Sequence, residues 1–252
     1  MSIHRAGFVI LALSQALVWS NLAHAATNVK DLLDKVEAQS APPNERVQLR
    51  MVIQESDGTK KERVLSLLRK NEGEPRALIR LQKPADLKGL SLLTVSEGDK
   101  EDQWLYLPSD KKSRRILGSN KKGKFLDSEI AYEDLRISTY KDFDNKIVKE
   151  SGGVVQVESK AKASTDSSYG KIVTWIEKKN NRIQKVDYYD KNGKLWKQAK
   201  FTNYQKVGSK FWRAKNVQVT NVQDKRKTQL IVQKVSVKAI TDEEVSLAAL
   251  ED

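Results

Sequence analysis

The chain of 252 residues has no cysteine, and its only two histidines are His4 and His24. Beyond position 25 the sequence therefore cannot build a disulfide, a zinc site of the usual His and Cys type, or a nucleophile activated by histidine. A Gly-rich phosphate loop and clustered metal ligands are also missing from the sequence. An enzyme would have to use carboxylates, lysines or a tyrosine. The sequence thus predicts a protein that is not an enzyme, with no cofactor and no metal.

Long apolar runs are also missing. The longest apolar stretch, residues 6–19, is interrupted by Ser14 and Gln15, whereas a membrane-spanning helix needs about 20 apolar residues. The stretch follows Arg5 and precedes Ala-His-Ala at 23–25, which is the pattern of a secretory signal peptide. The sequence predicts a signal peptide over residues 1–25, a single domain over 26–252, and a periplasmic location. A membrane anchor is the alternative interpretation.

Basic residues outnumber acidic ones by 46 to 33, which gives a formal net charge of +13. This balance favours anionic surfaces such as phospholipid head groups, lipopolysaccharide or nucleic acid. Export to the periplasm argues against nucleic acid and leaves an anionic membrane surface as the expected partner. For most of these lysines, an ordinary solvated position on strands and hairpin tips is the alternative.

Apolar spacing predicts a mainly β protein with a few helices. Residues 27–39 have helical spacing with Asn28 as the cap, and residues 47–54 then alternate as a strand that turns at Asp57 and Gly58. A second helix, capped by Asp127 or Ser128, is predicted near residues 128–135, and Thr241 is the predicted cap of a last helix. Further strands are predicted at 64–68, 76–81, 103–107, 112–117, 145–149, 154–158, 172–176, 183–189, 195–204, 210–219 and 228–237.

Evenly spaced antiparallel strands of this kind indicate one continuous, strongly curved sheet or a barrel. The two predicted amphipathic helices, at 27–39 and near Ile130, would cover its concave apolar face. Such an arrangement encloses a cavity. The expected fold is therefore an incomplete, strongly curved antiparallel β-barrel with an α-helical lid.

Residues 102–135 carry the most specific pattern in the chain. A Trp-Leu-Tyr-Leu-Pro run at 104–108 is followed by Arg114 and Arg115 and then by Tyr-Glu-Asp-Leu at 132–135. This pattern, together with the hairpin DYYDKNGKLWKQ at 187–198 and the acidic, apolar C-terminal tail, resembles the LolA-like family of periplasmic outer-membrane lipoprotein-sorting proteins. The resemblance implies an incomplete barrel whose apolar interior receives acyl chains. It also implies a carrier that delivers a lipid or lipoprotein toward the outer membrane or a membrane exporter.

An acyl-binding cavity needs large apolar side chains without buried charges, because each buried CH₂ group contributes about 0.8 kcal/mol. The residues predicted to line it are Leu49, Met51, Ile79, Trp104, Tyr106, Trp175 and Phe201. Each could instead be an ordinary core residue packed under the helices.

Arg114 and Arg115 have two possible roles in this picture. They either bind phosphate or carboxylate at the cavity rim, as a planar guanidinium can, or they pair with Glu129, Glu133 or Asp134 and latch the lid.

The sequence leaves two main functions open. The first is a non-enzymatic carrier, expected to be a monomer, whose partners are an acylated lipid or lipoprotein and an inner-membrane exporter or transporter. The second is a basic periplasmic module that docks on an anionic membrane surface or a protein partner without a lipid cargo. An empty apolar cavity favours the carrier, whereas an interior filled by the chain's own side chains favours the docking module. A hydrolase using two carboxylates would require two acids that face each other in a cleft.

Overall fold

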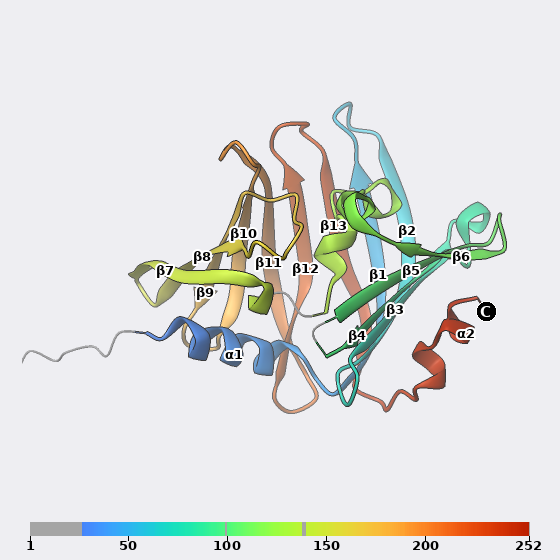
Figure 1. Cartoon of the computed structure of the whole chain (residues 1–252), viewed down its shortest axis with the longest axis horizontal. Helices are drawn as coiled ribbons and strands as arrows, with labels where there is room; N and C mark the ends of the chain where they lie inside the picture. The colour runs from blue at the N-terminus through green and yellow to red at the C-terminus, as the bar shows by residue number, and fades with distance from the viewer. Residues whose placement is uncertain (1–26, 99, 138–139, 252) are drawn as a thin grey trace, which may run out of the picture.

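A computed structural model describes residues 27–98, 100–137 and 140–251 (Figure 1). The predicted signal peptide, residues 1–25, lies outside the described residues. Thirteen strands of the described part form one antiparallel sheet in the order β6-β5-β4-β3-β2-β1-β13-β12-β11-β10-β9-β8-β7. The edge strands β6 and β7 do not pair with each other in this part of the chain. The predicted fold, a curved antiparallel sheet that does not close into a complete barrel, is confirmed.

The elements occupy most of the described chain. The strands are β1 (Asn44–Gln54), β2 (Lys60–Lys70), β3 (Arg76–Lys83), β4 (Ser91–Glu97), β5 (Lys100–Leu107), β6 (Lys112–Ile116), β7 (Phe143–Ser151), β8 (Val154–Ala161), β9 (Lys171–Glu177), β10 (Arg182–Tyr189), β11 (Leu195–Val207), β12 (Phe211–Asn221) and β13 (Lys227–Ser236). The α-helices are α1 (Val29–Ser40) and α2 (Leu247–Leu250), and the 3₁₀ turns are η1 (Ala85–Leu87), η2 (Gly118–Lys122), η3 (Phe125–Asp127), η4 (Tyr132–Leu135), η5 (Tyr140–Asp142) and η6 (Glu243–Val245).

Irregular pairing explains why so long a sheet curves. The register shifts within the pairing of β1 with β13, of β2 with β3, of β7 with β8, and of β10 with both of its neighbours. An extra residue on one strand increases the local right-handed twist and bends that strand. Asn203, with φ of +54°, adds a further irregularity inside β11. The sheet therefore wraps around α1 and the segment that follows β6 (Figure 1).

Two of the three predicted helices differ in the structure. The first, α1, is present as expected, with the Asn28 side chain accepting the Asp31 backbone N–H at 3.1 Å. The α-helix predicted at 128–135 is wrong: Leu126 and Asp127 have positive φ, Ser128 and Ala131 are extended, and only the 3₁₀ turn η4 at 132–135 is helical. The predicted Thr241 cap is also wrong, since Ser246 caps α2 by accepting the Ala249 N–H at 3.1 Å.

Three apolar clusters stabilise the two faces of the sheet. The largest lies on the concave face and is built around Met51, Leu65, Leu81 and Leu92. A second cluster joins α1 to β8 and β9 on the same face, and Ile183 packs against both of these clusters. A third cluster lies on the convex face, where the C-terminal segment 240–250 covers β3, β4 and β5. Among the described helices, none has the length and apolar character needed to cross a membrane.

Candidate functional site

A line of large apolar side chains crosses the concave face from β1 to β11. Met51 is opposite Leu230, Leu230 is opposite Val217, and Val217 is opposite Phe201. Directly opposed residues in antiparallel strands place their side chains on the same face, so these four form one continuous row, here named the apolar row. Met51 is buried, but the other three side chains keep part of their surface exposed. The row is therefore an apolar surface that is only partly covered.

Residues 118–135, here named the inner segment, lie over the same face. Phe125 and Ile130 are 2% and 5% exposed and pack into the cluster that contains Met51. Tyr132 meets the Phe125 ring edge to face, with ring centres 5.8 Å apart. In Figure 1 the inner segment crosses in front of β1, β2 and β13, while α1 crosses the lower ends of β9 to β12 in this view. The chain's own side chains thus fill part of the concave interior.

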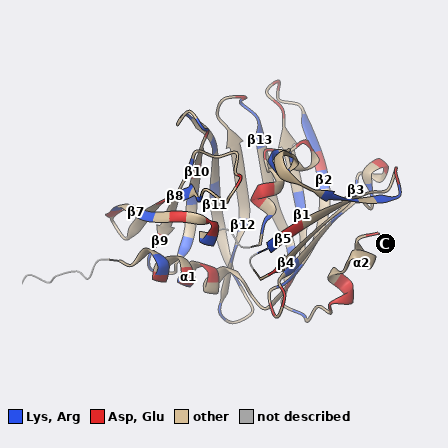
Figure 2. Cartoon of the chain, in the orientation of Figure 1, with Lys and Arg blue, Asp and Glu red and all other residues tan. Residues whose placement is uncertain are grey.

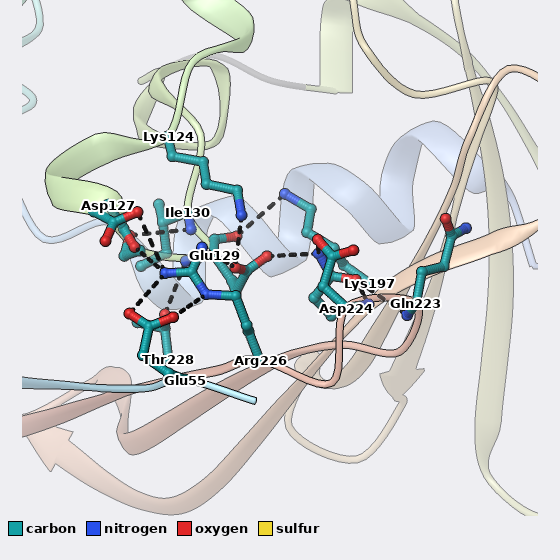
Figure 3. A network of polar contacts seen from close by, with 12 residues as sticks. Glu55, Lys124, Asp127, Glu129, Ile130, Lys197, Gln223, Asp224, Arg226 and Thr228 are labelled. Carbon is teal, nitrogen blue, oxygen red and sulfur yellow. Dashed lines mark hydrogen bonds and ion pairs between the residues drawn. The ribbon is translucent and has the colours of Figure 1, made fainter. Parts of the chain in front are cut away.

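A buried carboxylate fastens the inner segment to the sheet (Figure 3). Glu129 is 1% exposed and accepts hydrogen bonds from Lys124 at 2.9 Å and from the Asn221 amide at 2.8 Å. Its backbone N–H donates to the Thr228 hydroxyl at 2.8 Å, and the Arg226 guanidinium lies 3.4 Å from its carboxylate. Since Asn221, Arg226 and Thr228 belong to the hairpin of β12 and β13, this contact joins segments about a hundred positions apart.

A second buried contact uses a lysine surrounded by rings. Lys197 is 3% exposed, and its ammonium lies 4.8, 5.3 and 5.2 Å from the ring centres of Tyr169, Tyr188 and Trp196. It donates to the Asp134 carboxylate at 3.1 Å, which places a full ion pair inside this aromatic enclosure. Burial raises the pKa of Tyr169 and of Tyr188 well above the usual tyrosine value. Both phenols therefore stay protonated at neutral pH.

Comparisons with known proteins agree with the fold of the sheet. A family model described as "Uncharacterized protein" matches residues 73–252 of the chain. The solved structure of an outer membrane lipoprotein-sorting protein domain from Vibrio parahaemolyticus is 26% identical, with a TM-score of 0.80, and the match covers 88% of this chain and 97% of that one. The chain belongs to the family of that model, and it has the LolA-like fold of these outer-membrane lipoprotein-sorting neighbours.

Two further solved structures share the fold of this LolA-like chain. A DUF1329 family protein from Desulfovibrio piger is 23% identical, with a TM-score of 0.82 over 87% of this chain and 96% of that one. A LolA superfamily protein from Nitrosomonas europaea is 17% identical, with a TM-score of 0.73 over 89% of this chain and 100% of that one. No curated protein matches the chain.

Four of the seven predicted cavity residues lie together on the concave face of the LolA-like sheet. Met51 belongs to the main concave cluster, and Leu49, Ile79 and Phe201 pack against it with part of their surface exposed. Whether they contact an acyl chain stays a prediction. Their common position follows from the alternation of side chains along β1, β3 and β11.

The other three predicted cavity residues lie on the convex face, in contrast to the prediction. Trp104 and Tyr106 pack against the C-terminal segment, while Leu105 between them faces inward. Trp175 stacks on Lys185, whose ammonium lies 4.0 Å from the ring centre, and its neighbour Ile176 faces α1. Both faces of β5 and β9 are apolar, so the strand pattern alone did not distinguish inside from outside.

The predicted latch of Arg114 and Arg115 is absent from the described structure. Arg114 pairs with Asp110 at 2.7 Å within its own hairpin and is 63% exposed. Arg115 pairs with Asp102 and lies 5.9 Å from the centre of the Trp104 ring. Neither contacts the acids at 129, 133 and 134, which the proposed latch required, because those acids bind Lys124, Arg226, Ser168 and Lys197 instead.

Sequence reasoning missed the residues that hold the inner segment. Lys197, Tyr188 and Trp196 lie in the hairpin 187–198, which was quoted only as part of the family pattern. A lysine between aromatic residues in that hairpin was the available signal for a buried cation. Arg226 and Asn221 gave no such signal, since their partners are distant in sequence.

Proposed function

We propose that the chain is a non-enzymatic periplasmic carrier that holds the acyl chains of a lipid or lipoprotein against its concave face. It would release this cargo toward the outer membrane or to an inner-membrane exporter. The observation that supports the proposal is the apolar row, whose members Leu230, Val217 and Phe201 are covered only in part. In a fold used by lipoprotein-sorting proteins, such a row is the natural place for an acyl chain.

Binding requires the inner segment to move away from the apolar cluster around Met51. Phe125 and Ile130 occupy the cluster around Met51, so an acyl chain first contacts the exposed part of the row and then replaces these two side chains. Each CH₂ group that enters contributes about 0.8 kcal/mol, so a chain of several carbons offsets the loss of a few side-chain contacts. The inner segment acts in this scheme as an occupant that the cargo displaces.

Native mass spectrometry with lipid extraction tests the proposal on protein purified from the periplasm without detergent. We expect a stoichiometric acylated species bound to the wild type. Phe201→Glu should abolish it by placing a charge in the apolar row, which an acyl chain cannot solvate. Trp175→Glu is the matched control, since Trp175 is an aromatic residue of the same sheet on the convex face beside Lys185. Loss of cargo in both variants, or in neither, would contradict the proposed site.

The second candidate function is a basic module that docks on an anionic membrane without a cargo. The packed side chains of Phe125 and Ile130 favour it, as does the formal net charge of +13. Lys and Arg are spread over both halves of the sheet rather than gathered at one place (Figure 2). Binding to vesicles rich in anionic phospholipid, combined with no extracted lipid and no competition for a fluorescent fatty acid, would select this function.

A further inference from the structure

Arg69 is a concave-face arginine whose guanidinium has no hydrogen-bond partner within the described residues. It lies on β2 directly opposite Glu45 of β1 and Ala77 of β3, so the three side chains share one face. Its Nε atom is buried and makes no hydrogen bond. Burial is also the main reason that the pKa of Arg69 is lowered, and the positive charge of Arg213 lowers it further.

The nearby acids are engaged by other groups. Glu45 is fully buried, and its carboxylate accepts hydrogen bonds from both nitrogens of one edge of Arg213, with 2.9 Å between Nε and Oε1. Glu101 accepts the Arg136 Nε–H at 3.0 Å and the Ile137 backbone N–H at 2.9 Å. The arrangement therefore places two arginines, Arg69 and Arg213, beside Glu45, which Arg213 already binds, while Arg136 binds the second acid, Glu101.

Burying unpaired donors on a charged group costs stability, because the group loses hydration without gaining a protein partner. Arg69 thus does little to stabilise the fold in the absence of a ligand. A guanidinium presents two parallel N–H donors, which suit the oxygens of a phosphate or carboxylate. The side chain is partly buried rather than sealed, so an anion can reach it.

The position of Arg69 relative to the apolar row fits an amphiphile. Glu45, opposite Arg69, and Met51, at the start of the row, are six residues apart on β1 and point to the same face. At 3.3–3.4 Å per residue this separation is about 20 Å, which is the length scale of an extended acyl chain with its head group. Leu49, also on this face, lies between them and continues the apolar surface.

We infer that Arg69, with Arg213 beside it, binds the anionic head group of an amphiphile whose acyl chain runs along β1 and reaches the start of the apolar row at Met51. The ligand class is an acyl chain that ends in a phosphate or a carboxylate. This inference rests on the proposed carrier function and adds a head-group preference to it.

Displacement of a fluorescent fatty acid from the mature protein tests the inference, with dodecyl phosphate, laurate and methyl laurate as competitors below their micelle concentrations. We expect the wild type to bind the two anions about tenfold more tightly than the neutral ester, the effect of one charged hydrogen-bonding contact. Arg69→Gln should remove this preference and leave the affinity for methyl laurate unchanged. Arg69→Lys should restore part of it, because the ammonium keeps the charge but loses the bidentate geometry.

Arg50→Gln is the matched control, since Arg50 lies on β1 at an exposed position and pairs with Glu62 at 3.7 Å. This variant should keep the full preference. The ligand-free Arg69→Gln protein should unfold at the same temperature as the wild type or at a higher one. An anion preference that survives Arg69→Gln, or a clear fall in the unfolding temperature of that variant without ligand, would overturn the inference.

The outcomes separate the two proposals. If all three competitors displace the probe equally and Arg69→Gln changes nothing, the acyl site stands and the head-group site fails. If neither the probe nor any competitor binds the wild type, the carrier function itself fails. A difference between dodecyl phosphate and laurate in the wild type identifies which anion the site prefers.

Discussion

The inner segment and α1 cover the same concave face by different means. The inner segment is fastened by buried charges, with Glu129 bonded to Lys124, Asn221 and Arg226. The helix α1 instead buries two apolar side chains, Leu32 and Val36, against β8 and β9. Its polar contact to the rest of the chain, in which the Tyr140 hydroxyl donates to the Asp34 carboxylate, is only partly buried.

This difference determines how each cover can move. A buried ion pair is stable only when all its partners are in place, because removal of one leaves an uncompensated charge in a medium of low dielectric constant. Apolar contacts are lost gradually and do not depend on exact geometry. We therefore expect the inner segment to have one defined position that is given up cooperatively, and α1 to shift with a smaller loss of stability.

The largest effect is expected from Glu129→Gln, which breaks the anchor of the inner segment. Gln keeps the shape of the Glu129 side chain and can still accept the hydrogen bond from the Asn221 amide, but it leaves Arg226 and Lys124 without their shared anion. Breaking a buried ion pair costs about 3–5 kcal/mol, and we expect a loss of free energy of unfolding in this range. Urea unfolding followed by tryptophan fluorescence measures it.

Glu62→Gln provides the control for that change, since Glu62 is an exposed glutamate whose nearest cation, Arg50, lies 3.7 Å away. Its substitution should alter the free energy of unfolding by less than about 1 kcal/mol. Equal effects of the two substitutions would show that burial of Glu129 does not fasten the inner segment, and the comparison of the two covers would no longer hold.

A smaller and more local effect is expected from Leu32→Ala in α1. Leu32 is 4% exposed, and Leu→Ala substitutions in a core cost about 2–5 kcal/mol, with the lower end expected where surrounding groups can relax. Hydrogen exchange should therefore increase in residues 29–40 and much less in residues 118–135. Lys35→Ala, at an exposed position of the same helix, should change neither region. Faster exchange in the inner segment would mean that the two covers move together.

The strands of this sheet were predictable where one face is apolar and the other polar. In β1 the alternation of Leu49, Met51 and Ile53 with polar residues gave both the strand and its inward face. The strand β4 was not predicted, because most of its residues are buried on both faces and no alternation is present. For the same reason the inward face of β5 was not evident, and Trp104 was placed on the wrong side.

The site was less predictable because distant partners decide its local structure. Residues 128–131 have a helical apolar spacing, yet the Glu129 N–H bonds the Thr228 hydroxyl and Ala131 forms a bridge with Lys124. These contacts hold the backbone extended against its local preference. In α1, by contrast, the Asn28 cap and the apolar spacing act within one segment, and the predicted helix is present.

Acidification is expected to give the smallest effect and to act on the two covers at separate carboxylates. Although burial alone would raise it, hydrogen bonds from Lys61 and attraction to Arg226 hold the pKa of Asp127 below its usual value. In α1, hydrogen bonds from Lys30 and Tyr140 lower the pKa of Asp34. A lowered carboxyl pKa stabilises the folded state above about pH 4, and this contribution is lost as the pH falls further.

Glu133 has the opposite sign, because burial raises its pKa and its protonation on acidification favours the folded state. Between pH 6 and pH 3, urea midpoints should therefore fall in the wild type, and fall less steeply in Asp127→Asn and in Asp34→Asn. At pH 4, the hydrogen exchange of Asp127→Asn should differ from that of the wild type in residues 118–135. The hydrogen exchange of Asp34→Asn should differ in residues 29–40. If both variants follow the wild-type pH curve, Asp127 does not fasten the inner segment and Asp34 does not fasten α1. The buried contacts of Glu129 and Leu32 alone would then account for the difference between the inner segment and α1.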